Sequence, residues 1–369
     1  MALFPLRYLF RGVISDTVST GSATQSTSQG RRRPGQHYLQ SPRSRTFSLR
    51  DLNALSDNEI EALFRKLRWT ETDGQPVCPK CKGLYHWRLE KQRRWKCRGC
   101  HKQFTITSDS IFAHHKMSLR DILTGVRSFI LNAKGNTAIA LSKELGCDYK
   151  TAFVMQHKLR EALMISMESI QLKGTVEIDG VWIGGYIKPE NVKINRVDRR
   201  LSANRNGKRR VVVGARERGE DGRAIVAVFD GEHEAVPWLR EHVERFAKVY
   251  SDESNGWLSL SASHDVEEIN HSERYAKGVI NTNQMESLFS RIRRGEGLHH
   301  SIAGRYLVRY AHDLTWRENN RRRDDRTRVH LALGAALQAP QSRSFGGYWQ
   351  HHGGNHVEKS SDDFFANFQ

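Results

Sequence analysis

The chain is organised around Thr175-Val176-Glu177-Ile178-Asp179-Gly180-Val181-Trp182-Ile183-Gly184-Gly185, an apolar run that Asp179 interrupts and two glycines close. Its β-branched residues favour a buried strand, and the glycine pair supplies the turn that ends it. A carboxylate inside such a strand is costly unless a cation meets it, because burying an unpaired charge costs several kcal/mol. We therefore expect Asp179 to have a metal ion or an arginine as its partner. The alternative is that the strand lies at an edge of the sheet, where the carboxylate faces water.

The charge balance of the 369-residue chain is strongly basic, with 59 Lys and Arg against 41 Asp and Glu and a formal charge of +18. A polyanion is the expected partner of such a chain. No apolar run approaches the roughly 18 residues that a membrane span needs, and no isolated basic amphipathic helix stands out. Nucleic acid, rather than a membrane, is therefore the expected partner.

The N-terminal segment is rich in Ser, Thr, Gln and Arg, and Asp16 is its single acid. Residues 1–46 are predicted to be a disordered basic leader. An organelle transit peptide has a similar composition, but the apolar start is short and no cleavage pattern is visible. Residues 47–75 are predicted to contain a short amphipathic helix, since Ser56 can cap it with Glu59 three residues later.

Four of the five cysteines form two C-x-x-C pairs, Cys78 with Cys81 and Cys97 with Cys100. Each pair places two sulfurs on one side of a tight turn, so together they predict a structural Zn²⁺ in a zinc ribbon at residues 76–108. The alternative, a pair of redox dithiols, needs a thioredoxin-like βαβ context that the sequence lacks. Such a zinc site suits a reducing compartment.

Residues 118–168 carry apolar side chains at helical spacing in three segments, and Gly146-Cys147-Asp148 makes a turn between the last two. This layout predicts a helix-turn-helix, whose last helix can lie in a DNA major groove, although many helical hairpins are only structural. The candidate DNA-binding residues on that helix are Lys150, Lys158 and Arg160.

From residue 174 the pattern changes to strands. Apolar runs at 175–183, 209–215 and 224–229 indicate an antiparallel meander, and a helix at 234–246 leads to a short strand that ends in Asp252. This is the order of a ribonuclease-H-like α/β core, which we predict for residues 174–323. In that topology the strand of Asp252 lies beside the strand of Asp179, and the two carboxylates face each other.

A third acid, Glu286, lies in the first turn of a predicted helix that Asn281, Thr282 or Asn283 can cap. The helix dipole favours an anion at that position, and a helix packed on the sheet can aim the carboxylate at the strand ends. A phosphate backbone that passes the acids would meet cations of the same helix, and the candidates are Arg291, Arg293 and Arg294.

Acids on two adjacent strand ends and a neighbouring helix can hold two divalent ions roughly 3.5 to 4 Å apart. That arrangement activates a nucleophilic oxygen and stabilises a leaving oxygen in phosphoryl transfer. Oxygen ligands favour Mg²⁺ or Mn²⁺ here, whereas zinc belongs to the cysteines. The candidate catalytic and magnesium-binding residues are Asp179, Asp252 and Glu286.

Several motifs follow one another in order along the chain. After the cysteine pairs and the helical region come Glu177-Ile178-Asp179-Gly180, Ser251-Asp252, Asn270-His271-Ser272, and Asn281-Thr282-Asn283 leading to Glu286. Together they resemble a DDE transposase of bacterial insertion sequences, in the ISXO2-like group with an N-terminal zinc ribbon. The resemblance covers about residues 47–323.

The resemblance implies metal-dependent cleavage at the ends of an insertion sequence, followed by attack of the free 3′ hydroxyls on target DNA. It makes Asp179, Asp252 and Glu286 the catalytic triad, and Arg293 stands where this group usually has lysine. His271 matches a recurrent histidine of the family, as a DNA contact or a packed hydrogen-bonding residue, and Asn283 of the motif before Glu286 is the second auxiliary candidate. The implied partner is double-stranded DNA, held by a homodimer or a larger assembly in the bacterial cytoplasm at the nucleoid.

Residues 324–369 show little pattern and are predicted to form a weakly structured tail. Two other functions use the same parts of the chain. One is a non-catalytic DNA-binding regulator in which the three acids are only structural. The other is a metal-dependent nuclease that does not use the new 3′ hydroxyl for strand transfer.

Overall fold

The computed structural model describes residues 38–132, 135–185, 190–198, 207–219, 221–252, 255–269, 282–299, 302 and 304–350. These residues divide into two compact units. The first takes in the described residues up to 132 together with 141–147 and 320–342, and the second takes in the remainder.

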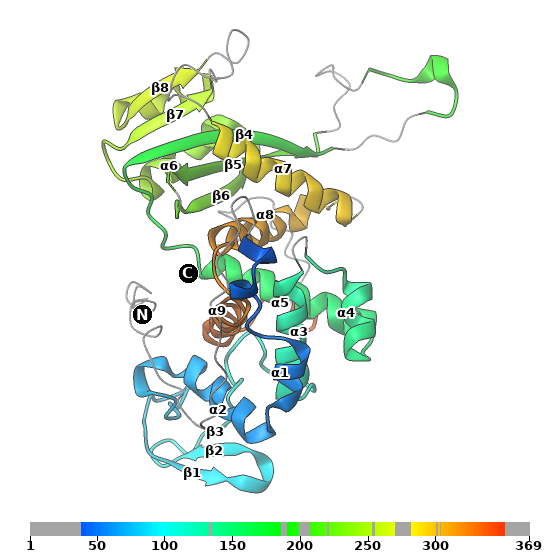
Figure 1. Ribbon diagram of the computed structural model, residues 1–369, viewed down its shortest axis with the longest axis vertical. Helices are drawn as coiled ribbons and strands as arrows, with labels where there is room; N and C mark the ends of the chain where they lie inside the picture. Colours follow the sequence, from blue (N-terminus) through cyan, green and yellow to red (C-terminus); the bar gives the residue numbers. More distant parts are fainter. Residues whose placement is uncertain are drawn as a thin grey trace. The chain divides into compact units, whose positions relative to one another are not determined.

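The zinc-ribbon region of the first unit is a three-stranded antiparallel sheet in the order β1-β2-β3 (Figure 1). Trp95 of β2 is paired with Phe104 of β3, and their ring centroids lie 5.9 Å apart. Trp69 packs edge-on against Trp95 at 5.4 Å, so a small aromatic core supports the ribbon. The strands are β1 (His86–Leu89), β2 (Arg94–Cys97) and β3 (Gln103–Phe104).

The first three helices of this unit begin at capping boxes, in which a serine accepts the N–H of an acid three residues on and that acid reaches back. Ser56 and Glu59 form the box of α2, which confirms the helix predicted within residues 47–75. Helices α2 and α3 both pack against α9. The bounds are α1 (Leu49–Ala54), α2 (Asp57–Arg68), α3 (Leu119–Leu131) and α9 (Asp325–Gln338).

Helix α9 shows that the predicted weakly structured tail was wrong for residues 325–338. Asp324 caps the helix, because its carboxylate accepts the N–H of Thr327. Val329 and Leu333 are buried in the unit. Much of the buried surface comes from alanines and a glycine, so the sequence offered little apolar contrast. Residues 351–369 lie outside the described part of the chain.

The end of the predicted leader is also ordered. Residues 38–46, expected to be disordered, contain the 3-10 turns Tyr38–Gln40 and Pro42–Ser44. The Thr46 hydroxyl donates to Asp324 at 2.5 Å, which ties this segment to the start of α9. The rest of the predicted leader, residues 1–37, lies outside the described residues.

Helices α4 (Ala138–Leu145) and α5 (Tyr149–Ile165) form where their spacing predicted. The boundary between the two units falls inside α4, so the helix-turn-helix stays a prediction. In the second unit α5 packs against α8, and the ring of Phe345 stacks on His157 with centroids 4.7 Å apart. Most of α5 is buried, as in a core helix.

The second unit is built on a five-stranded mixed sheet in the order β6-β5-β4-β7-β8 (Figure 1). Strands β4, β5 and β6 are antiparallel neighbours, whereas β7 runs parallel to β4, and β8 runs parallel to β7. This order confirms the predicted meander, helix and returning strand, and β8 adds a strand to it. The strands are β4 (Thr175–Gly184), β5 (Arg209–Glu217), β6 (Ala224–Phe229), β7 (Lys248–Asp252) and β8 (Asp265–Ile269).

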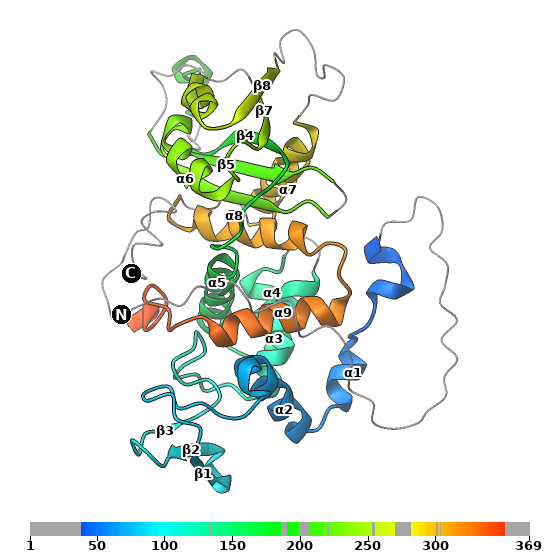
Figure 2. The ribbon, with the colours of Figure 1, turned by 90° about the vertical axis from the view of Figure 1, so that its left-hand side faces the viewer.

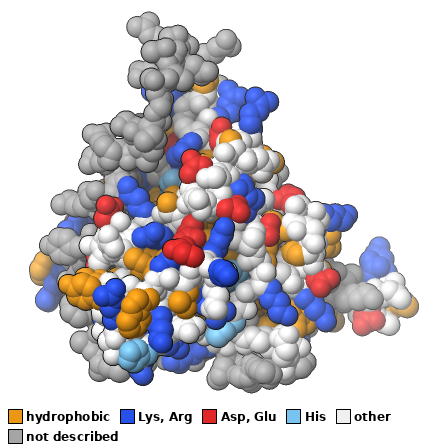
Figure 3. All heavy atoms as spheres, turned by 90° about the horizontal axis from the view of Figure 1, so that it is seen from below, with side chains coloured by type: hydrophobic (Ala, Val, Ile, Leu, Met, Phe, Trp, Pro, Cys, Tyr) orange, Lys and Arg blue, Asp and Glu red, His pale blue; other side chains and the backbone are white. Residues whose placement is uncertain are grey.

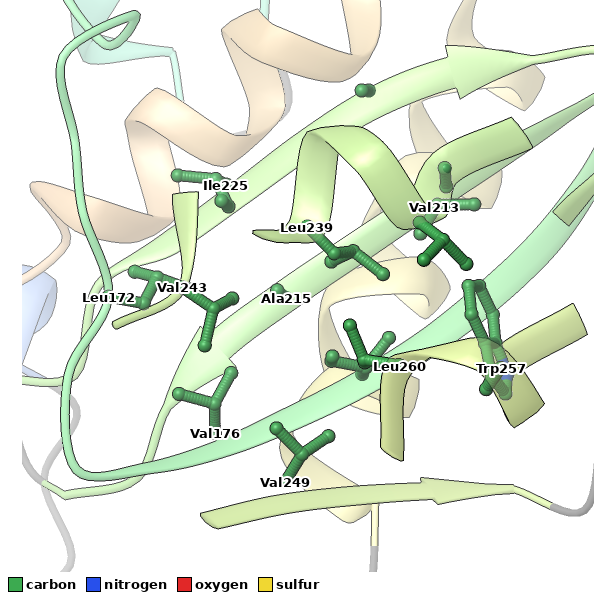
Figure 4. Packing of buried hydrophobic residues seen from close by; sticks show 14 of the residues in the cluster. Leu172, Val176, Val213, Ala215, Ile225, Leu239, Val243, Val249, Trp257 and Leu260 are labelled. Carbon is green, nitrogen blue, oxygen red and sulfur yellow. The ribbon is translucent and has the colours of Figure 1, made fainter. Parts of the chain in front are cut away.

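Apolar side chains cover both faces of this sheet, because successive residues of a strand point to opposite sides. On one face Val176 packs in a cluster with Leu239 of α6 and Trp257 (Figure 4). On the other face Val181 packs in a cluster with Met285 of α7 and with side chains of α8. The helices are α6 (Val236–His242), α7 (Asn283–Leu298) and α8 (Gly304–Asn319), and Figure 2 shows α7 and α8 beside the sheet.

Helix α6 is shorter than the predicted 234–246. It ends at His242 because Val243 becomes extended and forms a parallel bridge with Leu172. None of the described helices is long and apolar enough to cross a membrane. Among the described residues, short 3-10 helices also lie in several connections, at Thr70–Thr72 (η3), Glu90–Gln92 (η4), Lys193–Asn195 (η5), Glu232–Ala235 (η7), Asn255–Ala262 (η8) and Tyr348–Gln350 (η9).

Candidate active site

Asp179 lies in β4, the central strand of the sheet, which excludes the edge-strand alternative. Alternation along the strand puts its side chain on the face of Glu177 and Val181, the face that α7 and α8 cover. The side chain is half-buried, and its Oδ1 accepts the N–H of Gly180 at 2.7 Å. The predicted strand therefore presents its aspartate beneath the helix layer.

Asp252 ends β7, next to β4. The parallel pairing of the two strands includes Glu177 with Tyr250. Asp179 and Asp252 each lie two residues further along, so the register brings them side by side on one face of the sheet. Oδ1 of Asp252 accepts a hydrogen bond from the indole N–H of Trp257 at 2.9 Å. The strand order thus supplies the juxtaposition of the two aspartates that the sequence predicted.

Glu286 lies in the first turn of α7 and is exposed to solvent. Helix α7 packs against β4 and β5, with the buried side chain of Met285 toward the sheet. Met285 lies against Gly214, the residue of β5 that is paired with Asp179. The helix therefore brings the third acid to the same part of the sheet as Asp179.

The pKa of Asp179 is raised, because of burial and because other carboxylates lie close to it. Burial, followed by the negative charge of Asp252, raises it to about 7. The N–H of Gly180 lowers it, while Glu286 and Glu232 add smaller upward contributions. A carboxyl group that other carboxylates crowd in this way is stabilised by a cation, which would favour its ionised form.

The donor set of the three acids fits Mg²⁺ or Mn²⁺, because it consists of carboxylate oxygens that solvent can reach. Asp179 and Asp252 are half-buried, and Glu286 is exposed. Their oxygens are spread more widely than the sulfurs of the zinc ribbon. Among the described residues, the cysteines form the group whose ligand atoms all lie within 4.8 Å of one another.

The four cysteine sulfurs converge as a tetrahedral zinc site requires. Sγ of Cys78 lies 3.5 Å from that of Cys100, and Sγ of Cys81 lies 3.5 Å from that of Cys97. A disulfide needs about 2.05 Å, so these are free thiols. The N–H of Cys100 lowers the pKa of Cys97 to about 7, whereas the pKa of Cys81, although the N–H of Gly83 lowers it, is raised overall by hydrogen bonds with the other thiols. These four residues fit structural Zn²⁺.

The predicted DNA-binding residues divide by their exposure. Lys150, Arg293 and Arg294 are exposed. Lys158 is half-buried, and burial lowers the pKa of its ammonium group. Arg291 forms an ion pair with the buried carboxylate of Glu318, so its position on α7 is tied to α8.

Arg160 does not fit the predicted DNA contact. Its side chain is fully buried, and its Nε donates to Asp313 of α8 at 3.2 Å. The guanidinium also lies 4.0 Å from the ring centroid of Tyr310. A group enclosed in this way has no surface to offer to a phosphate, so Arg160 joins α5 to α8. Of the auxiliary candidates, Asn283 is the exposed first residue of α7, and His271 lies outside the described residues.

The sequence analysis assigned no function to two residues that lie near the acids. Glu177 precedes Asp179 by two residues, and that spacing on a buried strand was the available signal. Glu232 approaches from η7, where its Oε1 accepts from the Trp182 indole at 3.2 Å. No local pattern pointed to Glu232, because it reaches the site only through the fold.

The zinc ribbon provides a basic surface of its own. Residues 78–104 contain nine Lys and Arg, with Glu90 as the single acid. A groove of about 580 Å³ beside β2 and β3 is lined in part by Arg93, Arg94 and Lys102, and Glu61 and Asp109 also line it. Figure 3 shows one face of the molecule, on which Lys and Arg are scattered among acidic side chains. The clustering of Lys and Arg in residues 78–104 is therefore a more specific indication of a DNA-binding surface than the net charge of the chain.

Comparison with known proteins gives two matches to domain families. Residues 171–319 match the ISXO2-like transposase domain, and residues 55–103 match the transposase zinc-ribbon domain. An uncharacterised protein in transposable element ISH50 of Halobacterium salinarum is 24% identical over 296 residues, which cover 77% of this chain and 98% of that protein. No solved structure matches the chain. The matches confirm the resemblance that the motifs indicated.

Proposed function

We propose that this chain, with its ISXO2-like transposase domain behind a transposase zinc ribbon, is a transposase that binds the ends of an insertion sequence, cleaves DNA strands and joins the 3′ hydroxyls to target DNA. The observation that carries the proposal is the register of β4 with β7, which sets Asp179 beside Asp252 under the helix of Glu286. This order of strands and helices is the one expected of a ribonuclease-H-like core.

The three carboxylates are the proposed ligands of Mg²⁺ or Mn²⁺. Bound there, the ions would activate a nucleophilic oxygen and stabilise the leaving oxygen of a phosphodiester. Hydrogen bonds fix the position of one oxygen of each aspartate: Asp179 accepts from the N–H of Gly180, and Asp252 accepts from the indole N–H of Trp257. Glu286 is exposed to solvent, so a DNA phosphate could reach its carboxylate.

The cations have separate proposed roles in holding DNA. Arg293 and Arg294 are exposed on the helix that carries Glu286, so they are placed to contact phosphates that pass the acids. The Lys and Arg side chains of the zinc ribbon would contact DNA elsewhere on the element end. Because two ends must be paired before joining, we propose a homodimer or a larger assembly as the working form.

The test uses the full chain with a labelled duplex that carries the flanking ends of its own genomic locus, in Mg²⁺ or Mn²⁺. Wild type is compared with Glu286→Gln and with Glu296→Gln, which removes an acid nearer the other end of the same helix. We expect metal-dependent 3′ nicking at the end boundary in wild type and in Glu296→Gln, and none in Glu286→Gln.

The other outcomes separate the alternatives. Binding of the duplex without cleavage by any of the three proteins would indicate a DNA-binding regulator. Cleavage without joining to a target plasmid would indicate a nuclease. Equal cleavage by wild type and Glu286→Gln would overturn the assignment of the third acid.

A further inference from the structure

Glu177 is a buried acid that the proposed reaction does not use. Its side chain is 1% exposed, although it lies on a strand that also carries Asp179. Residues two apart on a strand share a face and are separated by roughly 7 Å along it. The Glu177 carboxylate is therefore a close neighbour of the acids without being aimed at solvent.

The carboxylate of Glu177 caps helix α7. Its Oε2 accepts the backbone N–H of Gln284 at 2.9 Å and that of Met285 at 3.2 Å. Thr282 occupies the N-cap position, but its side chain makes no capping hydrogen bond. The free N–H groups at a helix start need acceptors. Here a residue of the sheet supplies the acceptor, and the second of these amides directly precedes Glu286.

Glu177 also connects α7 to the strand of Asp252. Its Oε1 accepts from Arg218 Nε at 2.9 Å. The Arg218 guanidinium lies 4.2 Å from the ring centroid of Tyr250, the β7 residue paired with Glu177. Asp252 follows Tyr250 by two residues. One carboxylate thus links the helix of the third acid to both strands that carry the first two.

A second buried ion pair supports the same end of the helix. Arg216, the β5 partner of Glu177, donates to the carbonyl of Gln284 at 3.5 Å. Arg216 also forms an ion pair with the buried carboxylate of Glu318 on α8, at 3.1 Å. Both backbone groups of Gln284 are therefore held from the sheet, and the start of α7 has a defined position above β4 and β5.

We propose that Glu177 is the positioning residue that holds the first turn of α7 on β4 and thereby sets Glu286 against Asp179 and Asp252. This inference rests on the proposed function, because it gives Glu177 its role through the metal-binding acids. Residues that orient metal ligands through hydrogen bonds typically change metal affinity about 10- to 100-fold when they are replaced. The expected effect of losing Glu177 is of that size.

The experiment measures Mn²⁺ binding by calorimetry and amide hydrogen exchange in α7, both on the full, zinc-loaded chain. The variants are Glu177→Ala, which removes both hydrogen bonds to α7, and Glu177→Gln, which keeps one acceptor oxygen. The matched control is Asp313→Asn, since Asp313 is a buried, ion-paired acid of the same unit whose partners Arg160 and Arg317 belong to α5 and α8.

We expect Glu177→Ala to raise the Kd for Mn²⁺ at least about tenfold and to speed exchange in the first turn of α7, with Glu177→Gln in between. Asp313→Asn should lower the unfolding temperature but leave the Mn²⁺ Kd within about twofold. In a Glu286→Gln background, Glu177→Ala should cause no further loss of Mn²⁺ affinity, since it acts through Glu286. A merely structural residue would weaken binding in both backgrounds.

Wild-type affinity and wild-type exchange in Glu177→Ala would overturn the inference. If that variant does not fold, Glu177→Gln alone decides, and it must show weaker Mn²⁺ binding than Asp313→Asn. Failure of the proposed function looks different. The wild-type chain would then bind no Mn²⁺. Hydrogen exchange in the first turn of α7 would still test whether Glu177 holds that helix, because faster exchange in Glu177→Ala supports the role and unchanged exchange contradicts it.

Discussion

Gly214 of β5 is paired with Asp179 of β4, and a Cβ atom on Gly214 would lie 2.3 Å from Cε of Met285. The absence of a side chain on one strand thus lets α7 approach the sheet beside the acid on the next strand. Phe289 and Val226 lie 3.4 Å from the same position, so the space is enclosed on several sides. The approach of α7 to Asp179 depends on this glycine.

Gly214→Ala should lower the free energy of unfolding by about 1–3 kcal/mol, because the added methyl displaces Met285 in a packed core. Urea unfolding measures this change. In a Met285→Ala background Gly214→Ala should cost less than in wild type, since the far end of the methionine that the methyl would meet is already removed. The control is Gly297→Ala on the exposed side of α7, where nothing lies within 4 Å. It should stabilise by up to about 1 kcal/mol, and a destabilisation there would count against the packing argument.

Removing one sulfur from the zinc ribbon should abolish its metal. In Cys100→Ser we expect the zinc content to fall from one ion per chain to near zero, and residues 76–108 to become sensitive to trypsin, because the zinc binding energy of about 10–16 kcal/mol is also folding energy. Cys147→Ser is the control, since Cys147 lies outside the four-sulfur group. Full zinc content in Cys100→Ser, measured by atomic absorption, would contradict the assignment.

Local patterns predicted the parts of the fold that depend on local causes. The strand around Asp179, the capping box at Ser56 and the cysteine pairs each carry their signal within a few residues. The juxtaposition with Asp252 was also predictable, because a helix after three antiparallel strands leaves few places for the next strand.

The remaining features depend on partners far away in the sequence. Glu177 caps a helix whose amides lie 107 and 108 residues later, and no spacing rule reveals such a pair. From the sequence alone Arg160 is expected to be a surface cation. In the structure it is buried and paired with Asp313 of α8, which lies 153 residues later. Helix α9 was missed because packing against α2 and α3, rather than apolar contrast, makes it a helix.

The placement of Arg160 and Arg293 predicts opposite behaviour on removal of their charges. Arg160→Gln should destabilise the protein by about 3–5 kcal/mol, because it leaves Asp313 buried with one partner fewer, and should leave the salt dependence of DNA affinity unchanged. Arg293→Gln should leave stability unchanged and reduce the slope of log affinity against log salt concentration by about 0.9. Urea unfolding and DNA titrations at several salt concentrations check both. If Arg160→Gln changed the slope of log affinity against log salt concentration, Arg160 would have to contact DNA after all.

The raised pKa of Asp179, about 7 against an ordinary value of 3.8, predicts how stability depends on pH without divalent ions. Between these two values the folded state keeps a proton that the unfolded state has lost. The free energy of unfolding should therefore fall as pH rises from about 4 to about 7, by at most about 4 kcal/mol from this group. Asp179→Asn removes this dependence, so the variant should be more stable than wild type at pH 8 and equal to it near pH 4.

The difference between wild type and Asp179→Asn is the quantity to measure, because the loss of zinc at low pH affects both proteins equally. Protons also compete with the ion for this carboxylate. The apparent Kd of wild type for Mn²⁺ should therefore rise about tenfold for each pH unit below about 7. A Kd that is constant between pH 5.5 and 7, or a stability difference that does not change with pH, would show that Asp179 is already ionised in the folded protein and that the acids do not crowd one another as the geometry indicates.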